Sequence, residues 1–226
     1  MKILALDTSC KTAMAVITDN GKIIAGIQLH DEKTHSVKLL PAIEYILSAA
    51  DILPQDLDCI AVTNGPGSYT GLRIGVTTAK TYSYTLNLPL IGINTLEALA
   101  KSVDVENNNI ICPLIDARNA RVYASAYQNG HEILETKPME CAEFCNILKE
   151  KYPSENLLFV GDGADANLSL ILDTLENAVI VSNEMICGSI VGLAKAANDN
   201  YLKAVRNEKL SECSAENLKV EYFKEY

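Results

Sequence analysis

The sequence predicts a duplicated α/β fold, in which each half of the chain forms a sheet with helices packed on it. Two observations carry this prediction. An apolar run ends in an aspartate twice, at Asp7 and Asp116, which are 109 positions apart, and an Asn-Gly pair follows each, with its glycine 14 residues after the aspartate. After the first of these segments the apolar residues change from a period of two to a helical period, and the second half repeats this order more loosely.

The first half begins with a β-meander, because Asn-Gly between apolar runs is a strong signal for a two-residue hairpin turn. Apolar residues at spacings of three and four then predict an amphipathic helix over His35–Ala50. The polar run at 106–109 is typical of a boundary, so we expect a first lobe of residues 1–109. Its remaining elements are expected to be strand Cys59–Thr63, helix Thr70–Leu86, strand Leu90–Ile93 and helix Thr95–Val103.

The second half is expected to form a second lobe over residues 110–226. After its own meander it should contain helix Cys141–Lys151, strand Leu157–Val160, helix Leu168–Leu175, strand Val179–Val181 and helix Ile190–Tyr201. The segment 207–226 is rich in charged residues, with Val220, Tyr222 and Phe223 as its strong apolar anchors. We therefore expect this tail to be extended and only partly ordered.

The composition indicates a globular protein with a sizeable core. Apolar residues make up 48% of the chain and charged residues 21%, both close to globular averages. The net charge is −10, which opposes any function that needs broad contact with phosphate backbones. If RNA is involved, we expect another chain to hold most of it.

Metal sites and hydrolytic triads find no support in the sequence. The seven cysteines include no Cys-x-x-Cys pair, so free thiols in a reducing compartment are expected. Cys141 and Cys145 would share one helical face, which is the alternative of a redox or metal pair, but two thiols alone make a poor site. The three histidines lack zinc-helix spacing, and no Gly-x-Ser-x-Gly segment is present. We expect neither a metal nor a cofactor.

The N-terminus predicts no secretory signal, because only four apolar residues lie between Lys2 and Asp7. No apolar run approaches the length of a membrane span. We therefore expect a soluble protein of the cytoplasm.

A Gly-rich loop at Asn64–Gly75 joins a buried strand to a helix. Free backbone amides at such a position attract anions, which makes Gly65, Gly67 and Ser68 candidates for an anion or nucleotide loop. The glycine spacing matches neither a P-loop nor a dinucleotide motif. The alternative is a tight turn whose glycines allow positive φ and close packing.

The helix after this loop carries a stripe of small residues at every fourth position. The stripe would let another helix approach closely, either the first helix of the same domain or a helix of a partner chain. It consists of Gly71, Gly75, Ala79 and Ser83.

Three segments resemble the TsaB (YeaZ) family, which takes part in threonylcarbamoyladenosine modification of transfer RNA: Leu4–Ser9, Gly65–Gly75 and Leu90–Glu97. The resemblance is strong over residues 1 to 130 and weaker toward the C-terminus. It implies the actin/Hsp70/sugar-kinase type of duplicated fold, which is ribonuclease H-like. It also implies a non-catalytic scaffold subunit that binds and activates TsaD, forms a larger complex with the ATPase TsaE, and meets transfer RNA only through TsaD.

The resemblance further implies that the pair of metal-binding histidines found in TsaD is missing here. Its two histidines correspond to Thr95 and Leu99, which cannot replace imidazole as ligands. The segment around Gly161 and Gly163 resembles the adenosine loop of the superfamily, so these glycines are further candidates for nucleotide contact. The alternative function is an ATP-dependent phosphotransferase of the same fold, with Asp7 as its metal-holding or basic residue.

The partner interface is expected on the two helices 35–50 and 70–86. An arginine at Gly75 or Ala79 should then block binding of TsaD and leave the subunit folded. In the absence of TsaD, a homodimer could use the same surface. The expected contact residues are Leu39, Ile43, Ile46, Gly71, Gly75, Ala79 and Ser83.

Overall fold

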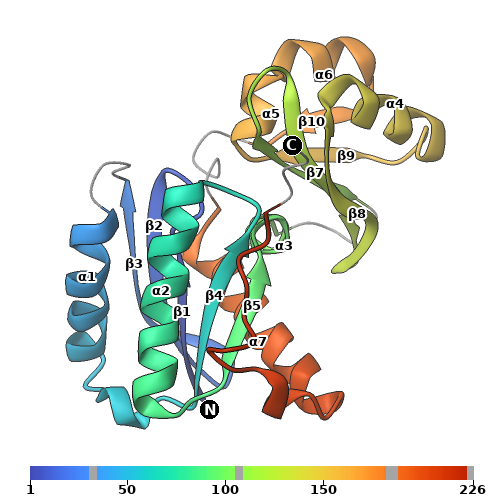
Figure 1. The fold of residues 1–226 in the computed structure, drawn as a ribbon. Helices are drawn as coiled ribbons and strands as arrows, with labels where there is room; N and C mark the ends of the chain where they lie inside the picture. Colours follow the sequence, from blue (N-terminus) through green and yellow to red (C-terminus); the bar gives the residue numbers. More distant parts are fainter. Residues whose placement is uncertain (31–34, 105–108, 182–187, 223–226) are drawn as a thin grey trace. The chain divides into compact units, whose positions relative to one another are not determined.

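The computed structural model describes residues 1–30, 35–104, 109–181 and 188–222. These residues form two compact units, each an α/β unit of its own (Figure 1). Unit 1 contains Met1–Ala98 together with Ser189–Tyr222, and unit 2 contains Leu99–Gly188.

Unit 1 is built on a five-stranded sheet in the order β3-β2-β1-β4-β5. The first three strands form the predicted antiparallel meander, and β4 and β5 continue the sheet in parallel with β1. Asn20 and Gly21 both have positive φ at the first hairpin turn, as a type I′ turn requires. The strands are β1 (Lys2–Asp7), β2 (Thr12–Asp19), β3 (Lys22–His30), β4 (Cys59–Gly65) and β5 (Leu90–Asn94).

Both faces of this sheet are covered by helices. Because strand side chains alternate between faces, Leu4 and Leu6 of β1 pack toward one helix layer, while Ile3 and Ala5 pack toward the other. The first layer contains α1 (His35–Ala49) and α2 (Tyr69–Leu86), close to their predicted bounds. The second layer contains α7 (Ile190–Arg206) and the end of α3 (Thr95–Ala100).

The position of α7 corrects the predicted lobes of 1–109 and 110–226. This helix follows the second half in sequence, yet it packs on β1, β2 and β5 of unit 1. Ala194, Ala196 and Ala197 are almost fully buried there and complete the core of the second face. Helical periodicity predicts an apolar face but does not say which sheet that face covers.

The C-terminal tail is better ordered than predicted. After α7 it makes one short 3-10 turn, Leu210–Glu212, and then returns along the unit 1 sheet. Leu218 and Val220 pack against the first core, and the amide of Glu221 donates to the carbonyl of Asn64 at 2.8 Å. The tail is therefore part of unit 1 as far as residue 222, and Phe223 lies outside the described residues.

Unit 2 repeats the strand order of unit 1. Its sheet runs β10-β9-β6-β7-β8, again with an antiparallel meander joined to parallel strands, and this confirms the duplication. Phe144 and Phe159 meet edge to face in its core, with ring centroids 6.4 Å apart. The strands are β6 (Ile110–Asp116), β7 (Arg121–Gln128), β8 (His131–Glu140), β9 (Leu157–Val160) and β10 (Ala178–Ile180), and the helices are α4 (Cys141–Lys151), α5 (Asp162–Ala166) and α6 (Leu168–Thr174).

Candidate functional site

The residues predicted to contact a partner are buried inside unit 1. The three apolar residues of α1 face the sheet, and the stripe of α2 faces it as well. All seven residues belong to the interior of unit 1 and are inaccessible to another chain. The predicted partner contact through these residues is therefore wrong. They are Leu39, Ile43, Ile46, Gly71, Gly75, Ala79 and Ser83.

The small-residue stripe serves a contact within the chain. The hydroxyl of Thr8, just after β1, donates to the carbonyl of Gly71 at 2.7 Å. A Cβ on Gly71 would meet the carbonyl oxygen of Thr8, and a Cβ on Gly75 would meet its hydroxyl. The α2 helix therefore lies directly on the turn after β1, so an arginine at Gly75 would disrupt the fold instead of leaving the subunit intact.

The outward sides of α1 and α2 carry large apolar and aromatic residues instead. The two helices pack against each other, and we name the exposed apolar and aromatic residues on them the α1–α2 outer face. Its most exposed member, Tyr84, has 81% of its surface accessible. The outer face comprises Val37, Leu40 and Tyr45 of α1 with Tyr69 and Tyr84 of α2.

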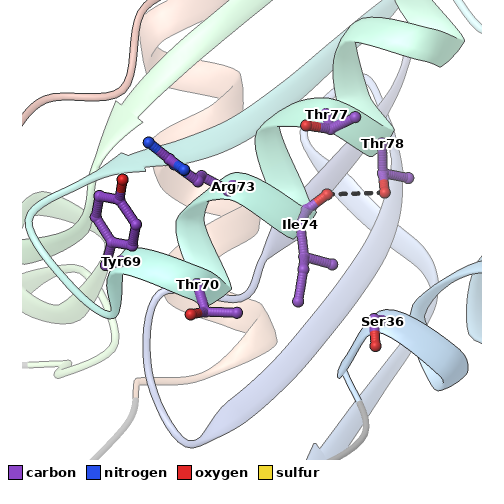
Figure 2. Close-up of a pocket in the computed structure, with 7 residues that line it drawn as sticks. All are labelled: Ser36, Tyr69, Thr70, Arg73, Ile74, Thr77 and Thr78. Atoms are coloured by element: carbon purple, nitrogen blue, oxygen red, sulfur yellow. Dashed lines mark hydrogen bonds between the residues drawn. The ribbon is translucent and has the colours of Figure 1, made fainter.

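A pocket of about 490 Å³ opens on this outer face (Figure 2). Hydroxyl groups, one isoleucine, one aromatic ring and one guanidinium line it. Figure 2 shows Tyr69 and Arg73 side by side on one flank of α2, with Ser36 contributed from α1. The lining residues are Ser36, Tyr69, Thr70, Arg73, Ile74, Thr77 and Thr78.

Arg73 is held in place by two tyrosines. Its guanidinium lies 4.0 Å above the ring centroid of Tyr69, and its Nε donates to the hydroxyl of Tyr222 at 3.0 Å. The two tyrosine rings lie 5.3 Å apart. The hydrogen bond to Tyr222 raises the pKa of Arg73 above its ordinary value. The sequence reasoning missed this cluster, because nothing in the sequence shows that the tail returns to the start of α2.

The Gly-rich loop packs tightly on the turn after β1. The amide of Ser68 donates to the carbonyl of Ser9 at 2.7 Å, and the hydroxyl of Ser68 caps α2 by accepting from the amide of Gly71 at 3.2 Å. A Cβ on Gly67 would lie 2.6 Å from the Ser9 carbonyl, and one on Gly65 would meet the backbone of the tail. These contacts favour the tight-turn alternative over an anion loop.

Asp7 lies buried beneath this loop. Its Oδ1 accepts from the amide of Ser9 at 2.8 Å, from the hydroxyl of Ser9 at 2.6 Å and from the hydroxyl of Thr63 at 2.7 Å. Burial raises the pKa of Asp7, and these hydrogen bonds and the nearby His35 oppose that shift. The carboxylate therefore joins the end of β1 to β4, and this contact is structural.

The second candidate loop packs equally closely within unit 2. Cβ atoms on Gly161 and Gly163 would meet the backbone of Leu114, so these glycines permit close approach to β6. The Oδ1 of Asp162 accepts from the amide of Asp116 at 2.9 Å. Asp162 and Asp165 place negative charge in the first turn of α5, which disfavours a phosphate there.

The residues at the two expected ligand positions are apolar or enclosed. Thr95 is buried, and its hydroxyl finds no hydrogen-bond partner among the described residues. Leu99 is also buried. Within the described ranges, no group of three or more histidine, cysteine or acidic residues is arranged to hold a metal ion.

The cysteine pair of α4 lies in the core of unit 2. Cys141 and Cys145 are fully buried, and a hydrogen bond between them lowers the pKa of Cys141 and raises that of Cys145. Burial also raises the pKa of the neighbouring Cys112. All three are free thiols.

Among the described helices, none is both long and apolar enough to cross a membrane.

Comparison with known proteins agrees with this architecture. The solved structure of YeaZ from Pseudomonas aeruginosa superposes with a TM-score of 0.77 at 21% identity, over 98% of this chain and 99% of that one. The ROK hexokinase from Thermus thermophilus superposes with a TM-score of 0.52 at 11% identity, over 91% of this chain and 100% of that one. The predicted fold class, two-lobed and of the actin/Hsp70/sugar-kinase type, is thereby confirmed.

Sequence comparison identifies the family. A family model described as TsaD, tRNA N6-adenosine threonylcarbamoyltransferase, matches residues 23–216. The tRNA threonylcarbamoyladenosine biosynthesis protein TsaB of Bacillus subtilis is 37% identical over 179 residues, which are 77% of this chain and 77% of that protein. The role shared by these relatives is the biosynthesis of threonylcarbamoyladenosine in transfer RNA. The protein described here belongs to the TsaB (YeaZ) family.

Proposed function

We propose that this protein is a non-catalytic subunit that binds TsaD through the α1–α2 outer face and activates it for threonylcarbamoylation of transfer RNA. The observation that carries this proposal is the outer face itself. Large apolar and aromatic side chains on two adjacent helices, such as Val37, Tyr45 and Tyr84, are exposed, and soluble proteins usually cover such a patch with a partner. The complex would work in the cytoplasm, with TsaE joining it and TsaD holding the transfer RNA.

Three features support the absence of catalysis in this subunit. Thr95 and Leu99 offer no imidazole at the positions that the resemblance assigns to metal ligands. Asp7 is enclosed by Ser9 and Thr63, so it lacks the open surroundings that a phosphotransferase would need for a metal-bound nucleotide. The net charge of −10 fits a subunit that leaves nucleic acid to its partner.

Arginine substitutions on the outer face test the proposal. We expect Tyr84→Arg and Tyr45→Arg to abolish co-elution with TsaD in size-exclusion chromatography, because each places an unpaired charge at the centre of an apolar interface. Val179→Arg is the matched control, since Val179 is an exposed apolar residue of unit 2. Co-elution of both tyrosine variants at the wild-type level would refute the placement of the interface.

A second copy of the chain should cover the same surface when TsaD is absent. The exposed apolar residues that favour TsaD binding favour self-association equally. Sedimentation velocity of the chain alone should show a dimer that Tyr84→Arg disrupts. Added TsaD should replace that dimer with a heterodimer, and a homodimer that persists beside bound TsaD would contradict a shared surface.

A further inference from the structure

The C-terminal tail reaches the outer face at the edge of its pocket. Two contacts hold the tail beside the Gly-rich loop: the side-chain amide of Asn64 donates to the carbonyl of Lys219 at 3.1 Å, and the amide of Glu221 donates to the carbonyl of Asn64 at 2.8 Å. The next residue, Tyr222, then meets both Tyr69 and Arg73. The tail is thus anchored by its backbone immediately before its side chain touches the pocket.

Arg73 is oriented by these contacts, yet no described residue gives it a counter-charge. Its Nε is bonded to Tyr222 and its face is stacked on Tyr69, which fixes the plane of the guanidinium. Among the residues that the structure describes, no acidic side chain forms an ion pair with Arg73, and its hydrogen bonds go to the uncharged hydroxyls of Tyr222 and Tyr69. Two parallel N–H groups on a fixed plane match the two oxygens of a carboxylate.

The surroundings of Arg73 favour a protein carboxylate over a phosphate ligand. The net charge of −10 repels a multivalent anion that approaches alone. A single carboxylate on a protein is different, because apolar contacts elsewhere on the outer face supply most of the affinity. Arginine and tyrosine are also the residue types that most often dominate the energy of such interfaces.

We propose that Arg73 binds an aspartate or glutamate side chain of the partner protein, and that Tyr222 of the C-terminal tail is the positioning residue that orients Arg73 for this contact. This inference rests on the proposed function, because the partner is the one that covers the α1–α2 outer face. It makes the C-terminal tail a component of the interface, in addition to the two helices.

The test measures the dissociation constant for TsaD by isothermal titration calorimetry, using full-length chains. Arg73→Gln should weaken binding by about thirtyfold, since it leaves the partner's carboxylate unpaired. Tyr222→Phe keeps the ring and removes only the hydroxyl, and should weaken binding by about fivefold. Arg73→Lys keeps the charge without the planar pair of donors and should fall between wild type and Arg73→Gln.

The double variant distinguishes a positioning role from a general loss of structure. If Tyr222 acts through Arg73, Tyr222→Phe should have no further effect once Arg73→Gln is present. The wild-type affinity should also fall more steeply with added NaCl than that of Arg73→Gln. Thermal unfolding of each variant alone should match the wild type within a few degrees.

Each contrary outcome has one meaning. Wild-type affinity in Arg73→Gln, while Tyr84→Arg still blocks binding, would overturn the carboxylate contact and leave the proposed function intact. Independent, multiplicative effects of Arg73→Gln and Tyr222→Phe would overturn the positioning role. Absence of binding by the wild-type chain would instead refute the proposed function.

Discussion

Gly71 and Gly75 show how one local contact decides the role of a motif. Both glycines allow α2 to rest on Thr8, so the requirement for small residues arises within unit 1. The spacing of the stripe in the sequence correctly predicts close approach. It could not predict the neighbour, because packing on the same chain and packing on a partner need the same residues.

The first prediction at this scale concerns Gly71. Gly71→Ala should lower the free energy of unfolding by about 2 kcal/mol, because the new Cβ meets the backbone oxygen of Thr8 and the helix must move. Thr77→Ala on the exposed side of α2 is the control and should not destabilise, since alanine has the higher helix propensity. Urea unfolding measures both, and equal stability of Gly71→Ala and wild type would contradict the packing described.

The second prediction concerns the pH dependence of Asp7. Its folded-state pKa is raised above 3.8, so its contribution to stability is fully present below pH 3.8 and is lost as the pH rises through the folded-state pKa. Asp7→Asn should therefore exceed the wild type in free energy of unfolding at pH 7, and this difference should shrink as the pH falls toward 3.8.

Asp19 provides a control of opposite sign. The N-terminal ammonium, 3.0 Å away, lowers the pKa of Asp19. The contribution of Asp19 to the free energy of unfolding is therefore present above pH 3.8 and is lost as the pH falls through the folded-state pKa. Asp19→Asn should thus be less stable than the wild type at pH 7. Guanidinium unfolding at several pH values measures both stability differences. If Asp7→Asn and Asp19→Asn shift the free energy of unfolding at pH 7 in the same direction, the opposite pKa shifts of Asp7 and Asp19 are contradicted.

At the scale of elements, periodicity predicted most helices and strands but not their neighbours. The bounds of α4 and β9 agree with the prediction, and α1 and α2 differ by one residue. The sequence pattern predicts a partner surface at the apolar residues of α1, whereas these residues form the core and the exposed residues between them belong to the outer face. A face that is apolar in sequence is most often the buried one.

The α7 helix leads to a prediction about folding. A chain that ends at residue 188 lacks the layer on the second face of the unit 1 sheet, which exposes residues such as Ile3 and Ala61. We expect this chain to lose the cooperative thermal transition of unit 1. A peptide of residues 189–222 added in trans should restore the transition. Cooperative unfolding of unit 1 without the peptide would show that α7 is dispensable.

At the scale of the whole molecule, the repeated strand order is the feature that the sequence predicted best. The two Asn-Gly turns and the aspartates before them stand at equivalent places in two sheets of the same topology. The boundary between units could not be predicted, because the chain returns to unit 1 after completing unit 2. The contact of the tail with Arg73 follows from this return and was equally hidden.

The central claim is that this subunit supplies binding and activation while TsaD supplies the chemistry. The most direct measurement is reconstitution from purified TsaD, TsaE, transfer RNA and threonylcarbamoyl-adenylate, with the modified nucleoside quantified in the presence and absence of this protein. Modification should require the protein and should be lost with Tyr84→Arg. Undiminished modification in its absence, or modification by this protein when TsaD is left out, would contradict the account.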